Sequence, residues 1–356
     1  MFTRYLKIEK FFLWLLVFIP ISIFFALFTS NTTLTFITSI IALVSLARII
    51  GFATREIALQ TNPTVAGLVS ATFGNVIELI IAILALAEGL IRVVQASIIG
   101  SILGNLLFLI GLSVFFGGLK YKQQRFNKHA VGVSATMLII AVVGLVIPTM
   151  YALSNPGNPR IPVLSDAVAI ILAVVYIAGL IFSLFTHRDL FDTTDEIRAT
   201  KYRPVISKKT AALILIIATI VVAFESELLV KSIEHAAVNI GLTQTFIGVI
   251  FIAIATNVAE KISAINFARE NKLDLSIEIG LSSAIQIALF VVPILVLVSE
   301  IFHFGFTLVF SLFEVISIVL AVMIINYLSA DGICNWLEGA QLLTVYIIIA
   351  TAFFFL

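Results

Sequence analysis

Long apolar stretches, separated by short polar segments, run along the whole chain of 356 residues. A helix needs about 20 residues to cross a hydrocarbon core of about 30 Å, whereas membrane-spanning strands are about half as long and alternate apolar with polar residues. The pattern therefore predicts an all-α polytopic membrane protein with eleven transmembrane helices. They are expected at residues 11–29, 34–53, 65–87, 93–117, 131–151, 163–185, 210–230, 243–267, 275–298, 304–328 and 339–356.

Composition agrees with this prediction and argues against several classes of function. Hydrophobic residues make up 61% of the chain and charged residues 12%, whereas an average soluble domain has about 25% charged residues. A net charge of +1 argues against a nucleic-acid partner. The sequence has neither a phosphate-binding loop nor a dinucleotide fingerprint. We therefore expect a protein in the lipid bilayer with no cofactor, and a homo-oligomer remains open.

The positions of the basic residues predict the orientation. Lys and Arg concentrate in cytoplasmic loops, and with the N-terminus inside, sixteen of them fall in inside segments and three in outside loops. Arg4, Lys7 and Lys10 precede an apolar stretch that is too long for a signal peptide and has no cleavage site, so we expect a retained helix. The prediction is a multi-pass plasma-membrane protein with a cytoplasmic N-terminus and an extracytoplasmic C-terminus.

The chain contains an internal repeat. A shift of 182 residues pairs GNVIELIIAIL (74–84) with TNVAEKISAIN (256–266) without gaps. The polar residues that coincide under this shift are Asn75 with Asn257, Glu78 with Glu260, and Ser101 with Ser283. The copies lie in the third and eighth spans, and because five spans separate them, they cross the membrane in opposite directions.

This repeat predicts two inverted-topology five-helix repeats with an extra N-terminal helix. The expected boundaries are 1–32 for the extra helix, 33–186 for the first repeat, 187–209 for a cytoplasmic linker and 210–356 for the second repeat. A weaker echo places Glu56 opposite Glu227, near the ends of the second and seventh spans.

The repeated Asn and Glu point to ion chemistry. A carboxylate in the middle of a membrane helix costs about 2.5–3.5 kcal/mol on insertion scales, so it needs a partner or a function. The spacing i to i+3 places each Asn and Glu on one helical face. Glu78 and Glu260, with the amides of Asn75 and Asn257, would then form an oxygen-rich midplane site of the kind that Ca²⁺ prefers.

The same carboxylates are expected to bind protons. Burial and mutual repulsion both raise the pKa of a carboxyl group, so protons and a divalent cation would compete for the pair. The prediction is a secondary antiporter rather than an enzyme. Glycines near the site, Gly67, Gly74 and Gly248, would permit close packing or a local helix break.

Other polar residues in the spans are less specific. Ser101, Ser283 and Gln286 follow the two Glu helices symmetrically and are candidates to line the pathway, although hydroxyl groups also join membrane helices. The carboxylates of Glu225, Glu227 and Glu314 could be proton relays or partners of Arg48.

The residues also resemble a known family. The stretches 74–113 and 256–293 are similar to the two signature repeats of the cation/proton exchangers, Ca²⁺/H⁺ antiporters within the calcium/cation antiporter superfamily, and the resemblance covers nearly the whole chain. It implies an eleven-helix inverted-repeat fold like that of sodium/calcium exchangers, proton-driven Ca²⁺ transport, and Glu78 and Glu260 as the ion-binding pair. The short linker resembles prokaryotic members.

Two positions depart from the family pattern. The second motif usually reads Gly-Asn-Ala-Ala-Glu-His, and here Thr256 replaces the glycine and Lys261 the histidine. A lysine next to Glu260 would compete electrostatically with Ca²⁺, so we expect it either to pair with Glu227 or Glu314, to join proton coupling, or to alter ion choice.

Three other functions stay in view. The first is a Na⁺/Ca²⁺ exchanger or a monovalent-cation/proton exchanger, which Lys261 makes plausible. The second is a cation channel, which needs a continuous pore with polar rings. The third is an intramembrane hydrolase, for which the sequence has no histidine-containing zinc motif and no suggestive Ser-Lys or Ser-His pairing.

Overall fold

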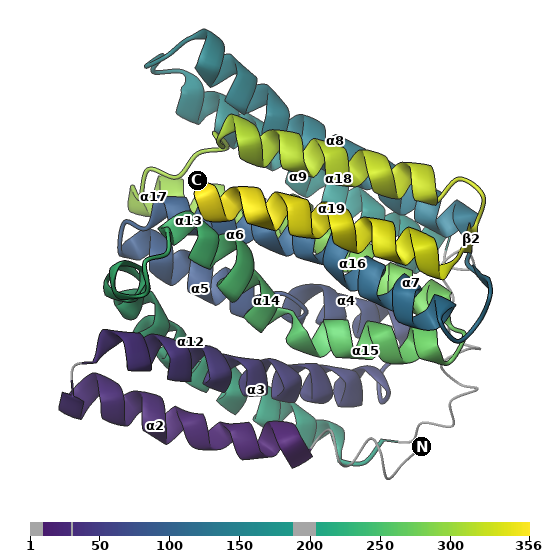
Figure 1. Cartoon of the computed structure of the whole chain (residues 1–356), viewed down its shortest axis with the longest axis horizontal. Coiled ribbons are helices and arrows are strands. Elements are labelled where there is room, and N and C mark those ends of the chain that lie inside the picture. The colour runs from purple at the N-terminus through teal and green to yellow at the C-terminus, as the bar shows by residue number, and fades with distance from the viewer. Residues whose placement is uncertain (1–9, 30, 188–203) are drawn as a thin grey trace. The chain divides into compact units, whose positions relative to one another are not determined.

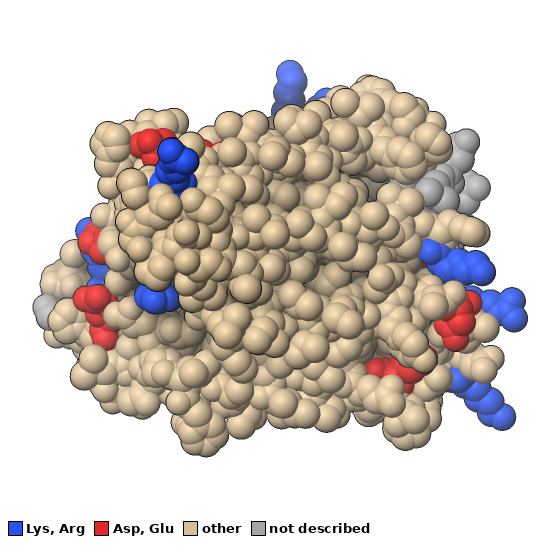
Figure 2. Space-filling view, turned by 90° about the horizontal axis from the view of Figure 1, so that it is seen from above, with Lys and Arg blue, Asp and Glu red and all other residues tan. Residues whose placement is uncertain are grey.

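The computed structural model of the chain describes residues 10–29, 31–187 and 204–356. Nine helices among these residues are long and apolar enough to cross a membrane, and a broken pair, Gln244–Thr256 with Val258–Arg269, makes ten if it counts as one span. The apolar helix Leu312–Leu328 is shorter, with 17 residues. In the face that Figure 2 shows, charged side chains stand in small groups toward the margins of a mostly uncharged surface. The prediction of an all-α polytopic membrane protein is confirmed.

The chain folds into two compact units, and each unit is built from separate stretches of sequence. The first comprises residues 1–97, 203–259 and 356, and the second comprises 98–202 and 260–355. Each unit therefore takes helices from both of the repeats that the sequence predicts. Most of the predicted linker, like Arg4 and Lys7, lies outside the described residues.

In the first unit, the long helices α3 and α12 pack along each other, and α2 lies against α3 (Figure 1). Phe36 and Leu43 of α3 and Val222 and Leu229 of α12 are buried in this unit. Its helical elements are η1 (Leu15–Val17), α2 (Phe18–Phe24), η2 (Phe25–Thr29), α3 (Thr32–Ala58), α4 (Pro63–Phe73), α5 (Val76–Ala87), the start of α6 (Ile91–Leu103), α12 (Lys208–Ile240), α13 (Gln244–Phe246), η5 (Ile247–Ile252), α14 (Ala253–Thr256) and the start of α15 (Val258–Arg269).

In the second unit, α7 packs against α19, α8 against α18 and α9, and α16 against both α7 and α8. Its elements are the rest of α6 and of α15, η3 (Gly104–Leu109), α7 (Ile110–Gly118), β1 (Gln124–Arg125), α8 (Lys128–Ser154), α9 (Ile161–Ile181), η4 (Phe182–Thr186), α16 (Leu273–Gln286), η6 (Ile287–Val291), α17 (Val292–Phe302), α18 (Leu312–Leu328), β2 (Ile333–Cys334) and α19 (Trp336–Phe355).

Side-chain caps set the helix starts. The side chains of Asn31, Asn62, Ser207 and Thr243 each accept a hydrogen bond from a backbone N–H three residues later, which satisfies a donor that the first helical turn leaves unbonded. At the other end of α12, Gly241 adopts φ 74° and stops the helix. That helix has 33 residues and ends at Ile240, so it extends ten residues past the C-terminal end of the predicted span 210–230.

One predicted span begins later than expected. Residues 304–311 are not helical, and α18 begins at Leu312 because Ser311 and Glu314 form a capping box. Three backbone N–H groups of this segment instead donate to side-chain hydroxyls. Phe306 donates to Ser299 at 2.7 Å, Leu308 to Ser165 at 3.2 Å, and Phe310 to Thr149 at 3.1 Å. Non-helical backbone is tolerated at such a place when the surrounding protein satisfies its polar groups.

Connecting segments meet in specific pairs. In the second unit, β1 pairs antiparallel with β2, with Gln124 opposite Cys334, and the Gln124 side chain donates to the carbonyl of Ala268 at 2.8 Å. In the first unit, Asn239, one residue before the end of α12, donates to Thr33 at the start of α3 at 3.1 Å. The segments 119–127, 268–272 and 329–335 are thus joined, and so are the neighbouring ends of α3 and α12.

Candidate functional site

The first copy of the repeated motif lies at a helix break. Helix α4 ends at Phe73 and α5 begins at Val76, and Asn75 between them has non-helical angles, φ −114° and ψ 27°. Glu78 lies in the first turn of α5. The side chains of both residues are buried, with 2% of Asn75 and 6% of Glu78 exposed.

The second copy breaks its helix at the same repeated position. Helix α14 ends at Thr256, α15 begins at Val258, and Asn257 has φ −103° and ψ 13°. The Asn257 amide donates to the carbonyl of Ala253 and to the Thr256 hydroxyl, both at 3.1 Å. Glu260 lies in the first turn of α15. Two segments 182 residues apart therefore share a backbone conformation as well as a sequence.

A break of this kind creates groups that bind ions. The first turn of a helix has N–H groups without helical partners and the positive end of the helix dipole, both of which stabilise a carboxylate there. The last turn of the preceding helix has carbonyl oxygens without helical partners. Carboxylate and carbonyl oxygens together are the ligands that Ca²⁺ takes in proteins.

The helices that follow the two motifs also correspond. Both contain a π-helical segment at the same repeated place, η3 at Gly104–Leu109 and η6 at Ile287–Val291. Within the second unit, the Asn105 side chain donates to the Ser283 hydroxyl at 2.8 Å. Ser101 and Ser283 are buried and Gln286 is half-buried. The structure thus brings Ser283 together with Asn105, and π segments of this type often occur at functional sites.

Lys261 is buried beside the start of η3. A β-carbon built on Gly104 would lie 3.9 Å from the Lys261 Nζ, and 5% of Lys261 is exposed. The lysine therefore points toward the helix that carries Ser101 and Asn105, both in the second unit.

The two carboxylates suggested as partners for Lys261 have other contacts. Glu227 is exposed and forms an ion pair with Lys231 one turn along α12, at 2.6 Å. Glu314 accepts the backbone N–H of Ser311 at 2.8 Å as part of the capping box of α18. Both carboxylates thus have local partners, and the pairing of Lys261 with either residue stays a prediction.

Glu56 also differs from its weak sequence counterpart Glu227. It is fully buried in α3, and its Oε2 accepts the backbone N–H groups of Val205 at 2.8 Å and Ile206 at 3.2 Å. The Gln60 side chain donates to the carbonyl of Ile206 at 2.9 Å. Glu56 therefore fastens the segment before α12 to α3.

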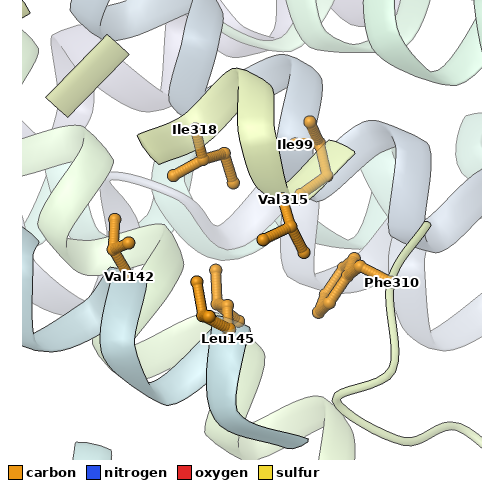
Figure 3. Close-up of a pocket in the computed structure, with 7 residues that line it drawn as sticks. Ile99, Val142, Leu145, Phe310, Val315 and Ile318 are labelled. Carbon is orange, nitrogen blue, oxygen red and sulfur yellow. The ribbon is translucent and has the colours of Figure 1, made fainter. Parts of the chain in front are cut away.

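A hollow in the second unit contributes no ion ligand. Its lining comes from α6, α8 and α18 and the residue Phe310, as Figure 3 shows, and consists only of apolar side chains.

A buried Glu78 and a half-buried Glu260 at broken apolar helices are typical of one class, the helical membrane proteins that handle ions within the bilayer. The profile of the family "Sodium/calcium exchanger protein" matches residues 31–185 and 210–355. The chain belongs to the sodium/calcium exchanger protein family.

Relatives within that family confirm the resemblance to its prokaryotic antiporters. The chain is 42% identical over 340 residues to the Ca²⁺/H⁺ antiporter ChaA of Bacillus subtilis, covering 95% of this chain and 97% of the relative. The structure of native YfkE matches with a TM-score of 0.84 and 39% identity, over 97% of this chain and 100% of that one. The H⁺/Ca²⁺ exchanger CAX matches with a TM-score of 0.72 over 98% of this chain and 92% of its own, at 16% identity, which shows a shared fold.

Proposed function

We propose that this protein is a secondary antiporter that exports Ca²⁺ in exchange for H⁺ by alternating access. The observation that carries the proposal is the repeated helix break, which places an Asn at the break and a Glu in the following first turn in both halves of the chain. The names of ChaA and of similar full-length relatives as Ca²⁺/H⁺ antiporters support the choice of ions.

In this proposal, Glu78 and Glu260 bind Ca²⁺ or protons in turn. A Ca²⁺ ion neutralises two carboxylates, and two protons do the same, so the pair is neutral with either load. A pair without either load keeps two negative charges, which are costly inside a bilayer. Exchange follows, because one load must replace the other before the carboxylates can cross.

Asn75 and Asn257 have a positioning role in the same proposal. Each carries the non-helical angles that end one helix and start the next, and each offers an amide oxygen. Ser101, Ser283 and Gln286 are proposed to line the path, with Asn105 added because its side chain bonds Ser283.

We further propose eleven spans arranged as two inverted repeats, 33–186 and 210–356, after the extra helix. The contacts between connecting segments support this count, because an N-terminus inside places 119–127, 268–272 and 329–335 all on the cytoplasmic side, and these segments meet. The family profile matches twice, once in each half. The plasma membrane fits export as the direction of transport.

Radioactive Ca²⁺ uptake into everted membrane vesicles tests the function. An imposed pH gradient should drive uptake, a proton uncoupler should abolish it, and Glu78→Gln or Glu260→Gln should each abolish it. Glu300→Gln, at an exposed position of α17, is the matched control and should transport at the native rate. Uptake that requires a sodium gradient instead, or that survives both substitutions at Glu78 and Glu260, contradicts the proposal.

A further inference from the structure

Another carboxyl group is buried in the first unit, away from the repeated motif in sequence. Glu225 lies in the middle of α12 with none of its surface exposed. Both of its carboxyl oxygens lie close to the Ser22 hydroxyl of α2, at 2.8 Å and 2.9 Å. The function proposed above does not use this residue.

Ser22 is itself an unusual residue. The stretch 11–28 contains no other hydroxyl, amide or charged side chain, and only the Trp14 indole adds a polar group. Much of the first helix is exposed on the unit, whereas Ser22 is fully buried. The single hydroxyl of this helix therefore faces the carboxyl group of Glu225.

The hydrogen atoms at this contact can be counted. The Ser22 Oγ also lies 2.7 Å from the carbonyl oxygen of Ile19, and a carbonyl oxygen can only accept. A serine hydroxyl carries one hydrogen atom, and an ionised carboxylate carries none. If that hydrogen goes to Ile19, the contact between Ser22 and Glu225 needs a hydrogen from Glu225.

The charges around Glu225 agree with a neutral acid. Among the described residues Glu225 forms no ion pair, and the nearby Glu227 is paired with Lys231. The helices that pack against α12 in this unit are α2, α3, α5 and α13. Helices α2 and α13 have no titratable residue, and the titratable residues of the other two are Arg48, Arg55 and Glu56 in α3 and Glu78 in α5.

We propose that Glu225 is a second proton-binding site of the protein, which holds its proton in a hydrogen bond to Ser22 and does not exchange it for Ca²⁺. The carboxylic O–H donates to the Ser22 Oγ, and the Ser22 O–H donates to Ile19. The hydrogen atoms of Glu225 and Ser22 then each have an acceptor, and the second carboxyl oxygen of Glu225 is left to accept from the nearby Ser39 hydroxyl. The retained proton joins the first helix to α12.

Loss of that proton rearranges the contact. The bond from the Glu225 O–H to Ser22 is lost, and the Ser22 O–H turns from the Ile19 carbonyl to the Glu225 carboxylate, so two hydrogen bonds become one. A buried charge also appears without a cation beside it, which is unfavourable. The proton therefore stabilises the seating of the first helix.

Infrared spectroscopy of the full-length protein in lipid tests the assignment. The difference spectrum between native protein and Glu225→Gln should show one C=O band of a protonated carboxyl group. That band should persist when Ca²⁺ is added and across the pH range of transport. Carboxylate stretching bands in its place, or loss of the band with Ca²⁺, would overturn the proposal.

A pair of variants tests the role independently of ion choice. Gln presents an amide N–H where the acid presents O–H, so Glu225→Gln should keep the native thermal stability and transport rate. Glu225→Ala removes the donor and should lower the unfolding temperature by several degrees. Loss of transport in Glu225→Gln with a native unfolding temperature would show that the proton is transported and would refute the proposal. The spectra and the unfolding temperature do not depend on whether the exchanged ion is Ca²⁺.

Discussion

Lys261 breaks the symmetry of the repeat at the scale of a single residue, because its counterpart under the 182-residue shift is Leu79. The neighbouring residues are conserved between the copies in both type and backbone conformation. Its Nζ lies beside Gly104, where a larger side chain would compete for the same space. The second half of the chain therefore carries a positive charge next to its Glu that the first half lacks.

Substitution of Lys261 by His should preserve exchange and alter its pH dependence. An unperturbed histidine has a pKa of about 6.5, so it carries the lysine charge only in acid. The rates of the variant and native proteins should agree below about pH 6 and separate above about pH 7. Initial rates of Ca²⁺ uptake measured against pH provide the check. Identical pH profiles would assign Lys261 to a structural contact.

The residues of the site could be predicted from the sequence only in part. Asn75, Glu78, Asn257 and Glu260 stand out because repetition at a fixed shift separates them from an apolar background. The role of Glu314 also had a signal, since Ser311 three residues earlier forms the Ser-x-x-Glu pattern of a capping box. The contact between Ser22 and Glu225 had none, because it joins residues 203 positions apart.

At the scale of helices, the apolar pattern predicted the spans well and their interruptions poorly. Gly74 marks one helix break, but the break at Asn257 follows a threonine and has no glycine beside it. The π segments η3 and η6 leave the apolar pattern unchanged, so hydropathy does not reveal them. Helix α18 starts later than predicted because hydroxyl side chains satisfy backbone N–H groups of 304–311.

The packing of α7 against α19 depends on a glycine. A β-carbon at Gly339 would lie 2.3 Å from the backbone N of Phe115, and backbone atoms cannot move aside as a flexible side chain can. Gly339→Ala should therefore destabilise the protein by about 1–3 kcal/mol, the usual cost of overpacking. Thermal unfolding of the purified protein measures this change.

Gly132→Ala is the control for that prediction. A β-carbon at Gly132 in α8 meets no atom within 4 Å, so this variant should unfold at the native temperature or slightly above it. Equal unfolding temperatures for the two variants would contradict the close packing of α7 and α19.

At the scale of the molecule, each compact unit combines parts of the two predicted repeats. The first unit holds the stretches up to 97 and from 203 to 259, and the second holds the stretches that follow them. This exchange of parts could not be predicted from the sequence, because the linear order of the chain suggests that each repeat is a domain. The repeats are defined by similarity of sequence, whereas each unit is defined by the contacts within it.

Thiol labelling tests the proposed orientation of the chain. Ser154→Cys lies at the exposed last residue of α8, and Gln123→Cys lies on an exposed segment between α7 and α8. A membrane-impermeant thiol reagent should label the first variant in intact cells and the second only after permeabilisation. The opposite pattern would invert the proposed topology.

The native cysteine supports this experiment. Cys334 is buried, and burial, with smaller contributions from the carboxylates of Glu338 and Asp331, raises the pKa of its thiol well above the usual range. The thiolate is the reactive form, so Cys334 should contribute little labelling. A Cys334→Ser background removes any remainder.

The division of each unit between distant stretches of sequence also governs how the protein is made. The glycine contact between α7 and α19 and the pairing of β1 with β2 join residues near the first third of the chain to residues near its end. Chains emerge from the ribosome N-terminus first, so α7 is made before the helix against which it packs. Until α19 has been synthesised and inserted, the surface of α7 that receives Gly339 contacts lipid or another protein. The incomplete chain is therefore the stage at which this surface most needs to be covered.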